Sequence, residues 1–278
     1  MFRTTTLLKL VSFRPSRFIS SASNKPGNLD GRVAIVTAGT DGIGLAIAKR
    51  LGQNGANVVV SSRKQENVDR AVDEMKTLGY KASGVTCHFG KPEDRKKLVE
   101  FTMNEYGSIN ILVSNAGVNP HPFDIMNTPE SVIDKTLELH IKANFQMIQE
   151  ITPFMAKSDY QGSIVLTSSI ASYVTHLYPG IYGITKAAVN AMARGFMPDL
   201  QKLNIRINCI PIGGIETKFL QEAKKNSEAK EIFLSHLPMG RFGTPEECAG
   251  LAAFLASDDS SYITGENFVI AGGVYTRP

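Results

Sequence analysis

The sequence predicts an α/β fold, a doubly wound parallel sheet of about seven strands with helices on both faces. Short runs rich in β-branched residues alternate with longer stretches that have helical spacing. The short runs are apolar on both faces, as expected for strands covered by helices on each side. A glycine-rich turn joins the first run to the first helical stretch. This order implies parallel strands joined by right-handed crossovers.

The expected elements alternate along most of the chain. Apolar, β-branched runs predict strands at 33–36, 57–61, 84–87, 109–113, 163–167, 205–210 and 267–270. Helical spacing of apolar residues predicts helices at 42–54, 66–78, 92–106, 129–157, 180–202 and 246–257. Pro92 marks the start of one of these helices, because a proline at the first helical position gives up no hydrogen bond.

Residues 215–240 depart from this alternation. They are charged, carry scattered apolar residues such as Phe219 and Leu237, and lie between two expected strands. In a doubly wound sheet such an insertion lies at the carboxyl edge, where ligands bind. We expect either a mobile lid near 215–240 or a pair of surface helices without a gating role.

Composition excludes several classes of protein. The chain has 278 residues, of which 42% are hydrophobic and 20% charged, so it can bury the core of one large domain. Its net charge of +4 comes from the cations of residues 1–29, which contain no acid, and the remainder is close to neutral. A basic nucleic-acid surface is therefore not indicated. No apolar run approaches the roughly 18–20 residues that span a bilayer.

The cysteines do not predict a metal site or a disulfide framework. Cys87, Cys209 and Cys248 lie far apart and form no CxxC motif. We expect free, buried thiols in a reducing compartment, and no bound metal.

The amino-terminal segment, 1–29, is rich in Arg and Ser and free of acids, which is typical of a mitochondrial transit peptide. Its apolar positions do not fall on one clean helical face, so a disordered basic tail is the alternative. Residues 30–278 are expected to form one domain.

A dinucleotide-binding turn is predicted after the first strand. The sequence Thr37-Ala38-Gly39-Thr40-Asp41-Gly42-Ile43-Gly44 leads directly into an apolar helix. Glycines let the backbone approach a pyrophosphate, and the helix N-terminus supplies free N–H groups and a positive dipole end. Asn115 ends another strand and can hold neighbouring backbone groups beside the nucleotide.

The end of the second strand predicts which cofactor binds. An NAD enzyme places Asp or Glu there, on the ribose 2′-hydroxyl. This chain instead has Ser62, Arg63 and Lys64, whose hydroxyl and cations suit a 2′-phosphate. The sequence therefore predicts NADP(H).

A catalytic group is predicted on the helix at 180–202. Lys186 follows Tyr182 by four residues, which places both side chains on one helical face. A nearby ammonium favours the phenolate, so we expect a lowered pKa for Tyr182. Ser169 ends the preceding strand and can hydrogen-bond a substrate oxygen.

Together these motifs resemble the short-chain dehydrogenase/reductase family, over roughly residues 30–275. Finer features resemble its NADP-dependent retinol dehydrogenase/carbonyl reductase subgroup, namely Thr37-Ala38, Ser61–Gln65, Cys87-His88, Ala256-Ser257 and Ser261–Glu266. The resemblance implies a Rossmann-type fold, an NADP-binding catalytic domain at 30–278 and a homotetramer. It also implies that Tyr182 is the acid/base, that Lys186 lowers its pKa and binds the nicotinamide ribose, and that Ser169 orients the carbonyl.

Some positions differ from the family pattern. His140 stands where the family usually has the Asn that carries a water chain to the lysine; it is either a replacement proton relay or a helix-interior ring packed under the site. His88 stands where many members have the Asp that contacts adenine, although the subgroup resembles this chain there. The family's Pro-Gly reads Pro211-Ile212-Gly213-Gly214 here. The resemblance implies further cofactor contacts from Gly213, Ile215 and Thr217.

These features predict NADPH-dependent reduction of a lipophilic ketone, aldehyde, quinone or retinal, and the reverse oxidation. The candidate substrate residues are mostly apolar or aromatic: Val118, His121, Phe123, Ile170, Tyr173, His176, Leu177, Tyr178 and Phe219. One alternative is a 3-oxoacyl reductase acting on an acyl carrier. Another is an NADP-binding oligomer with weak or lost catalysis. The carboxyl terminus, Thr276-Arg277-Pro278, departs from the subgroup's peroxisomal tripeptide, so we expect mitochondria, with peroxisome or cytoplasm as alternatives.

Overall fold

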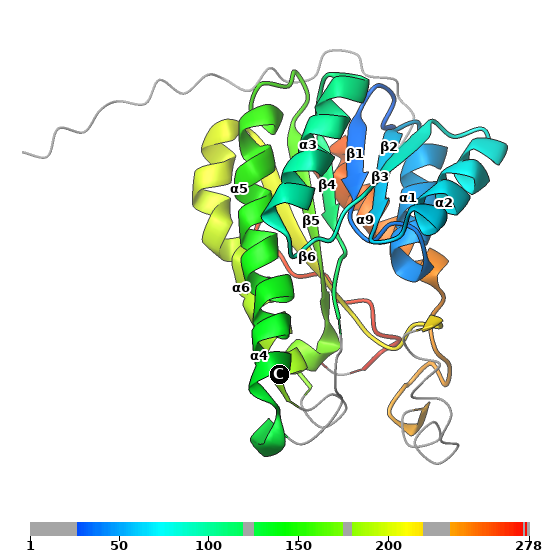
Figure 1. The fold of residues 1–278 in the computed structure, drawn as a ribbon. Helices are drawn as coiled ribbons and strands as arrows, with labels where there is room; N and C mark the ends of the chain where they lie inside the picture. The colour runs from blue at the N-terminus through cyan, green and yellow to red at the C-terminus, as the bar shows by residue number, and fades with distance from the viewer. Residues whose placement is uncertain (1–26, 119–124, 175–179, 219–233, 275, 277–278) are drawn as a thin grey trace, which may run out of the picture.

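A parallel sheet forms the centre of the computed structural model, which describes residues 27–118, 125–174, 180–218, 234–274 and 276. Within these residues the sheet has six strands in the order β3-β2-β1-β4-β5-β6 (Figure 1). The strands are β1 Val33–Val36, β2 Asn57–Ser62, β3 Ala82–Thr86, β4 Ile111–Ser114, β5 Gly162–Ser169 and β6 Ile205–Ile212. The chain order reverses between β1 and β4, which is where such sheets bind their ligands.

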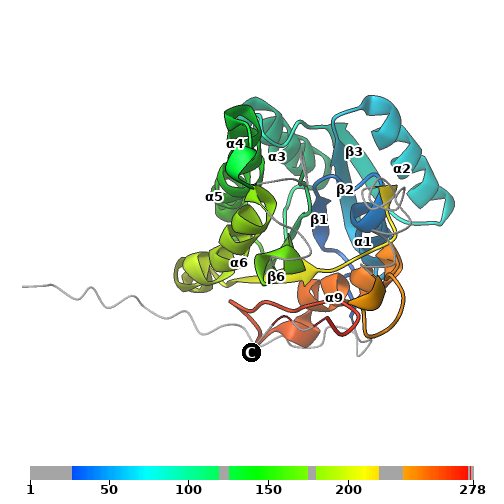
Figure 2. The ribbon, with the colours of Figure 1, turned by 90° about the horizontal axis from the view of Figure 1, so that it is seen from below.

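Helices cover both faces of the sheet, which confirms the doubly wound prediction (Figure 2). One face carries α1 Gly42–Gln53, α2 Gln65–Thr77 and α9 Pro245–Ala256. The other carries α3 Pro92–Tyr106, α4 Glu130–Leu137, α5 Ala143–Met155 and α6 Ile181–Leu200. Each face buries its own cluster of apolar side chains, and every residue of β5 and β6 is buried.

The prediction of a seventh strand at 267–270 is wrong as a regular strand. This segment forms only isolated parallel bridges to β6, Cys209 with Asn267 and Ile212 with Ile270. Pro211 lies between the two bridges on β6 and has no N–H to donate. The ladder therefore loses its middle hydrogen bond, although Ile270 N–H still donates to the Pro211 carbonyl at 3.0 Å.

The single helix predicted at 129–157 is also interrupted. Between α4 and α5 the backbone forms a π-helical turn, Glu138–Lys142, in which the Ala143 N–H reaches back to the Glu138 carbonyl. The Asn144 side-chain amide donates to the His140 carbonyl at 2.8 Å. Apolar periodicity predicts which helix face is buried, but it does not reveal a side-chain hydrogen bond to the backbone or a π-helical turn.

The amino end of the folded body lies slightly upstream of residue 30. Gly27 N–H donates to Asp259 at 2.8 Å, Leu29 N–H donates to the Asn54 carbonyl at 2.8 Å, and Leu29 is fully buried. The rest of the predicted targeting segment lies outside the described residues. Most of the predicted lid at 215–240 also lies outside the described residues. In its described part, Ile215 forms a β-bridge with Gly243.

The described residues also bear on the expected thiols, metals and membrane spans. Cys87, Cys209 and Cys248 are free and buried, as predicted. Across the described ranges, His, Cys, Asp and Glu form no group of three or more placed for a metal. None of the helices described combines the length and hydropathy that crossing a bilayer requires.

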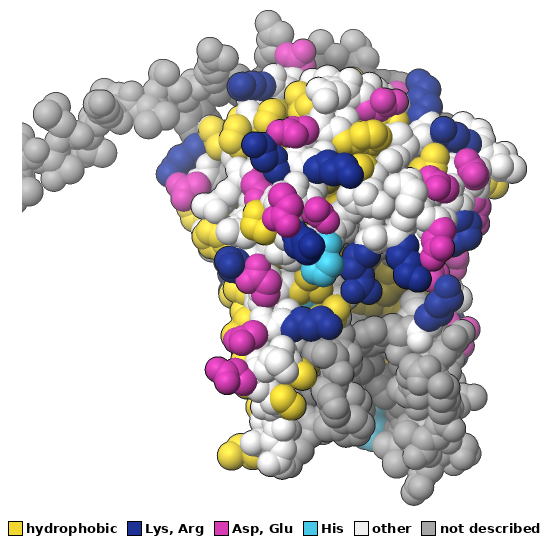
Figure 3. Space-filling view, viewed as in Figure 1, with side chains coloured by type: hydrophobic (Ala, Val, Ile, Leu, Met, Phe, Trp, Pro, Cys, Tyr) yellow, Lys and Arg dark blue, Asp and Glu magenta, His cyan; other side chains and the backbone are white. Residues whose placement is uncertain are grey.

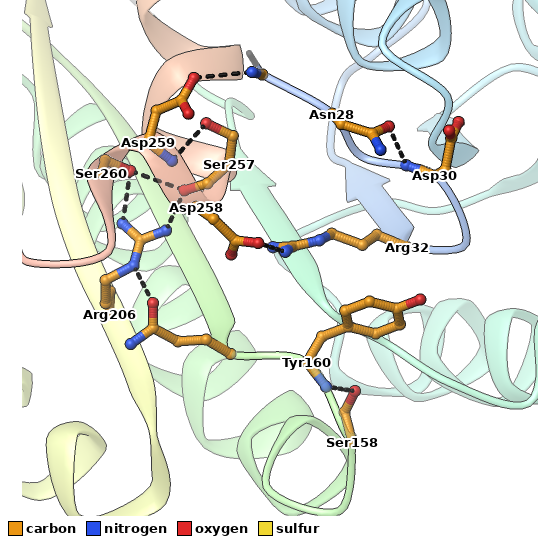
Figure 4. A network of polar contacts seen from close by, with 12 residues as sticks. Asn28, Asp30, Arg32, Ser158, Tyr160, Arg206, Ser257, Asp258, Asp259 and Ser260 are labelled. Carbon is orange, nitrogen blue, oxygen red and sulfur yellow. Dashed lines mark hydrogen bonds and ion pairs between the residues drawn. The ribbon is translucent and has the colours of Figure 1, made fainter. Parts of the chain in front are cut away.

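Two buried arginines share one carboxylate at the amino edge of the sheet (Figure 4). Arg32 pairs with Asp258 at 2.5 Å and lies under the Tyr160 ring, 5.0 Å from its centroid. Arg206 donates to the Ser257 carbonyl and the Ser260 hydroxyl, and burial together with the charge of Arg32 lowers the pKa of Arg206 to about 10. Asp258 therefore compensates charge that the surrounding protein cannot solvate.

We predict that Asp258→Asn lowers the free energy of unfolding by about 3 kcal/mol, because it leaves the Arg32 guanidinium buried without its counter-ion. The matched control is Asp199→Asn, whose partner Lys202 is exposed, and it should cost less than about 0.5 kcal/mol. Urea unfolding monitored by circular dichroism measures both. Equal losses in the two variants would contradict the assignment.

Candidate active site

A cavity of about 330 Å³ opens at the carboxyl edge of the sheet, where the ends of β1, β4, β5 and β6 meet. This volume is typical of a small-molecule site. Eleven of the predicted site residues line it: Asp41, Gly42, Ile43, Gly44, Asn115, Ser169, Tyr182, Lys186, Gly213, Ile215 and Thr217. The parallel topology thus brings together residues that are far apart in the sequence.

The glycine-rich turn forms one wall of this cavity. Asp41 caps α1 by accepting the Gly42 N–H at 2.9 Å, and Gly42 has a positive φ of 50°. A side chain on Gly44 would collide with the Ala38 carbonyl oxygen and lie 2.6 Å from the Asn115 amide nitrogen. The turn therefore presents the α1 N-terminus to the cavity with little side-chain cover, as an anionic ligand requires.

Thr37 and Asn115 brace the turn from the neighbouring strand. The buried Thr37 hydroxyl accepts the N–H groups of Asn115 and Ala116, at 2.9 and 3.1 Å. The Asn115 amide in turn donates to the Ala38 carbonyl at 3.3 Å. Thr37, predicted as a cofactor contact, is buried beneath the turn and does not line the cavity.

The residues predicted to select the cofactor, Ser62, Arg63 and Lys64, lie outside the cavity, at the end of β2. Gly39 N–H donates to the Ser61 carbonyl at 3.2 Å, which ties the end of β2 to the glycine-rich turn. Arg63 and Lys64 are exposed next to Ser62. Figure 3 shows Lys and Arg side chains gathered beside a histidine, around a hollow below the sheet. Arg63 and Lys64 are thus positively charged side chains at the surface.

His88 follows β3 and carries an unsatisfied polar atom. Its backbone N–H donates to Asp94 at 2.7 Å, while its buried Nδ1 has no hydrogen-bond partner among the described residues. A buried nitrogen without a partner costs free energy, so a ligand group that bonds to it would be favoured.

The predicted catalytic side chains come together where β5 ends and α6 begins. Lys186 Nζ donates to the Thr167 carbonyl at 3.2 Å, and the Ser168 hydroxyl donates to the Lys186 carbonyl at 2.9 Å. Tyr182 and Ser169 are hydrogen-bonded to each other, and Lys186 Nζ lies 5.7 Å from the Tyr182 ring centroid. The end of β5 therefore fixes both side chains of α6.

Burial, rather than the neighbouring ammonium, sets the protonation of this pair. Desolvation raises the pKa of Tyr182 to about 12, although the hydrogen bond with Ser169 opposes the rise. Desolvation also lowers the pKa of Lys186 to about 8. Our expectation of a lowered tyrosine pKa is wrong for the chain alone, because removing the phenolate from water outweighs the attraction of a partly deprotonated amine.

His140 lies in the π-helical turn and does not line the cavity. Its ring is fully buried, accepts the Val118 N–H at Nε2 and contacts the Thr185 hydroxyl at Nδ1. Burial and the charge of Lys186 lower the pKa of His140 to about 3. It packs behind the cavity, against Tyr182 and Thr185.

The sequence did not single out several residues of the cavity. Lys218 forms an ion pair with Asp41 at 2.6 Å, and this contact lowers the pKa of Asp41. The other unpredicted lining residues are Ala38, Gly117, Thr167, Ser168, Ile212 and Gly214. Most of these residues are small and lie at strand ends, and that pattern is a sequence signal for a cavity wall. The contact of Lys218 with Asp41 has no such signal, because it depends on the tertiary path of the chain.

Of the expected substrate residues, Val118 lines the cavity, and Ile170 is buried beside it on the short helix after Ser169. Tyr173 is described but does not line the cavity. His121, Phe123, His176, Leu177, Tyr178 and Phe219 lie outside the described residues.

Comparison with known proteins gives a consistent result. A family model described as "Enoyl-(Acyl carrier protein) reductase" matches residues 37–275. Dehydrogenase/reductase SDR family member 4 of Bos taurus is 44% identical and aligns over 94% of each chain, and its namesake in Caenorhabditis elegans is 45% identical over 89% of this chain and 96% of its own. A solved 7α-hydroxysteroid dehydrogenase, complexed with NADH and 7-oxo glycochenodeoxycholic acid, is 31% identical, covers 92% of this chain and 99% of its own, and has a TM-score of 0.85.

The six-stranded parallel fold agrees with that of the solved relative, and the sequence match covers most of the chain. This chain belongs to the short-chain dehydrogenase/reductase family, whose members are oxidoreductases that bind nicotinamide cofactors.

Proposed function

We propose that the chain catalyses NADPH-dependent reduction of a lipophilic carbonyl compound to the alcohol, and the reverse oxidation. The observation that supports it most directly is that Ser169, Tyr182 and Lys186 line the same cavity as the N-terminus of α1. A proton donor and a phosphate-binding helix end thus share one space, as hydride transfer to a carbonyl requires.

The chain's own residues would divide the work as follows. Bound nicotinamide supplies or accepts the hydride at the carbinol carbon. Tyr182, protonated at neutral pH, gives its proton to the carbonyl oxygen, and Ser169 donates a hydrogen bond as charge develops there. Lys186, held by the Thr167 carbonyl, places a cation beside the phenol and would bind the ribose of the nicotinamide when the cofactor is present.

The residues present fit an NADP(H) molecule. The exposed Arg63 and Lys64 supply the charge that a 2′-phosphate needs, and no carboxylate ends β2. His88 follows β3, beside the end of β2, and stands at the position that the family resemblance assigns to the adenine contact. The relative solved with NADH shows the cofactor class, and the preference for NADP(H) rests on these residues.

Apolar walls support a lipophilic substrate. Val118, Ile212 and Ile215 line the cavity, and its one described lining lysine besides Lys186 is paired with Asp41. A solved relative is complexed with 7-oxo glycochenodeoxycholic acid, a bile-acid derivative whose steroid body carries a 7-oxo group. Diketones, quinones, retinal and oxo-steroids therefore form the test panel, with a 3-oxoacyl thioester to test the acyl-carrier alternative.

We also propose a homotetramer in mitochondria. The resemblance of the motifs to the family supports the first, and the acid-free, Arg- and Ser-rich residues 1–26 support the second. Because Gly27 and Leu29 are bound to the folded body, removal of a presequence should end at or before Gly27. Sequencing the amino terminus of the protein from isolated organelles checks this, and an uncleaved protein absent from mitochondria would reject the address.

Tyr182→Phe should lower kcat by at least about 1,000-fold while leaving NADPH affinity within about threefold, because the variant loses only the transferable proton. Turnover of the panel and fluorescence titration of NADPH measure the two quantities. Tyr160→Phe, which changes an exposed tyrosine outside the cavity, is the control. Tight NADPH binding by the wild type without any turnover would favour an NADP-binding protein that has lost catalysis.

The pH dependence should differ between the two directions. A pKa of about 12 keeps Tyr182 protonated, and a pKa of about 8 keeps Lys186 mostly charged from pH 6 to 7, so kcat/KM for reduction should be flat over this range and fall as pH rises through 8. Oxidation needs the phenolate, whose population rises about tenfold per pH unit below the pKa, so kcat/KM for oxidation should rise steeply with pH. Initial rates in both directions at constant ionic strength test this. A pH-independent oxidation rate would show that Tyr182 is not the base.

Arg63→Asp should reverse the cofactor preference, lowering the affinity for NADPH by about 100-fold and raising that for NADH, because a carboxylate repels the 2′-phosphate and accepts the ribose hydroxyls. Lys81→Asp makes an equal charge change on an exposed residue at the other edge of the sheet. Isothermal titration with both nucleotides separates local from overall charge. Unchanged NADPH affinity in Arg63→Asp would show that another residue selects the cofactor.

A further inference from the structure

His140 connects three parts of the site through a chain of hydrogen bonds. Its Nε2 accepts the Val118 N–H at 3.0 Å, and its Nδ1 lies 2.8 Å from the Thr185 hydroxyl oxygen. Thr185 donates in turn to the Tyr182 carbonyl at 3.0 Å. The ring thereby joins the loop after β4, the π-helical turn and the first turn of α6.

These contacts fix the tautomer of the ring. A backbone N–H can only donate, so Nε2 must hold a lone pair and the proton must lie on Nδ1. The Thr185 hydroxyl donates its hydrogen to the Tyr182 backbone carbonyl, so its oxygen can accept the hydrogen of Nδ1. Protonation of Nε2 would set two donors against each other, so the hydrogen bonds require a neutral imidazole.

Packing around the ring is equally tight. The titratable side chains that face His140 are Tyr182, whose ring meets it edge-on with centroids 5.7 Å apart, and Lys186. A side-chain carbon on Gly117 would lie 3.3 Å from His140 Nε2 and 3.5 Å from Lys186 Nζ. The His140 ring and the Lys186 amine therefore both pack against Gly117, a residue of the cavity wall.

The backbone of His140 is held as well. Asn144 donates to its carbonyl at 2.8 Å, and the Asn144 amide oxygen accepts the Ser114 hydroxyl at 2.6 Å. This links the π-helical turn to the end of β4. Both ring nitrogens of His140 therefore have hydrogen-bond partners, and so does its backbone carbonyl.

We propose that His140 is a positioning residue, a neutral strut that sets the separation between the first turn of α6 and the loop after β4, and that it does not pass protons to Lys186. A proton relay must accept and release protons in turn, and both nitrogens of this ring are committed to fixed partners. Because Tyr182 stands on one side of the strut and Val118 on the other, the strut places the phenol relative to the cavity. The catalytic part of this inference rests on the proposed function.

Nuclear magnetic resonance of the full chain labelled with ¹⁵N-histidine tests the strut without any substrate. We expect the Nδ1–H tautomer for His140, no titration between pH 5.5 and 8.5, and a Val118 amide protected from hydrogen exchange. An Nε2–H tautomer, or a His140 signal that titrates near neutral pH, would overturn the proposal.

Kinetics of variants test the positioning role. Thr185→Val removes the acceptor of the ring proton, and His140→Leu removes the ring without introducing the family's usual Asn; each should lower kcat about 10- to 100-fold, because small displacements of a reacting group are costly. The double variant should be no slower than the slower single variant, since both changes break one strut. Thr102→Val is the matched control, a fully buried threonine on α3 whose hydroxyl also bonds its own helix, and it should keep kcat within twofold.

Added imidazole separates the strut from a relay. Small bases and acids can replace a missing proton carrier but cannot restore a displaced helix turn, so imidazole should leave kcat of His140→Leu unchanged. Rescue by imidazole, or fully additive losses in the double variant, would overturn the proposal. If His140→Leu does not fold, Thr185→Val and the resonance measurements still decide. A wild-type protein inactive on every carbonyl would reject the proposed function, while the tautomer and the Val118 exchange would still test the strut.

Discussion

The parallel pairing of β5 with β6 is the contact on which the site depends. It runs from Gly162 with Ile205 to Ser169 with Ile212, and every residue in it is buried. Because the strands are parallel, their carboxyl ends stop at one edge and bring Ser169 and the backbone of the opposite cavity wall together. The Thr167 carbonyl, near the end of β5, then receives the Lys186 amine and so fixes α6 against the sheet.

Burial governs the chemistry that this frame makes available. Tyr182, Lys186 and His140 lie side by side where charge is poorly solvated. Burial raises the pKa of Tyr182 and lowers those of Lys186 and His140, and each shift favours the neutral form of the group. A protonated phenol suits reduction, whereas the phenolate needed for oxidation must form against desolvation. The same cost keeps His140 neutral and leaves it to act through hydrogen-bond geometry. Protonation states in this site thus follow from packing as much as from which ionisable groups are present.

Much of the fold and many of the site residues were predictable because their signals are local. Apolar runs located β1 to β6, Pro92 located the start of α3, and the glycine-rich turn located the N-terminus of α1. The interruption at Glu138–Lys142 and the broken pairing at 267–270 were not, because they depend on the Asn144 side chain and on where Pro211 meets a distant segment. The pairing of Lys218 with Asp41 likewise joins residues that only the folded chain brings within reach.

The sequence by itself determined the class of fold, the order of its elements and the residue types available for binding a dinucleotide and for donating a proton, since periodicity, turn chemistry and motif spacing are properties of short segments. Only the tertiary structure decided how those groups behave. It placed Tyr182 where desolvation outweighs its neighbouring amine, and it committed both nitrogens of His140 to Val118 and Thr185. Solvation and hydrogen-bond partnership arise from atoms contributed by distant parts of the chain, and so they exist only once the chain has folded.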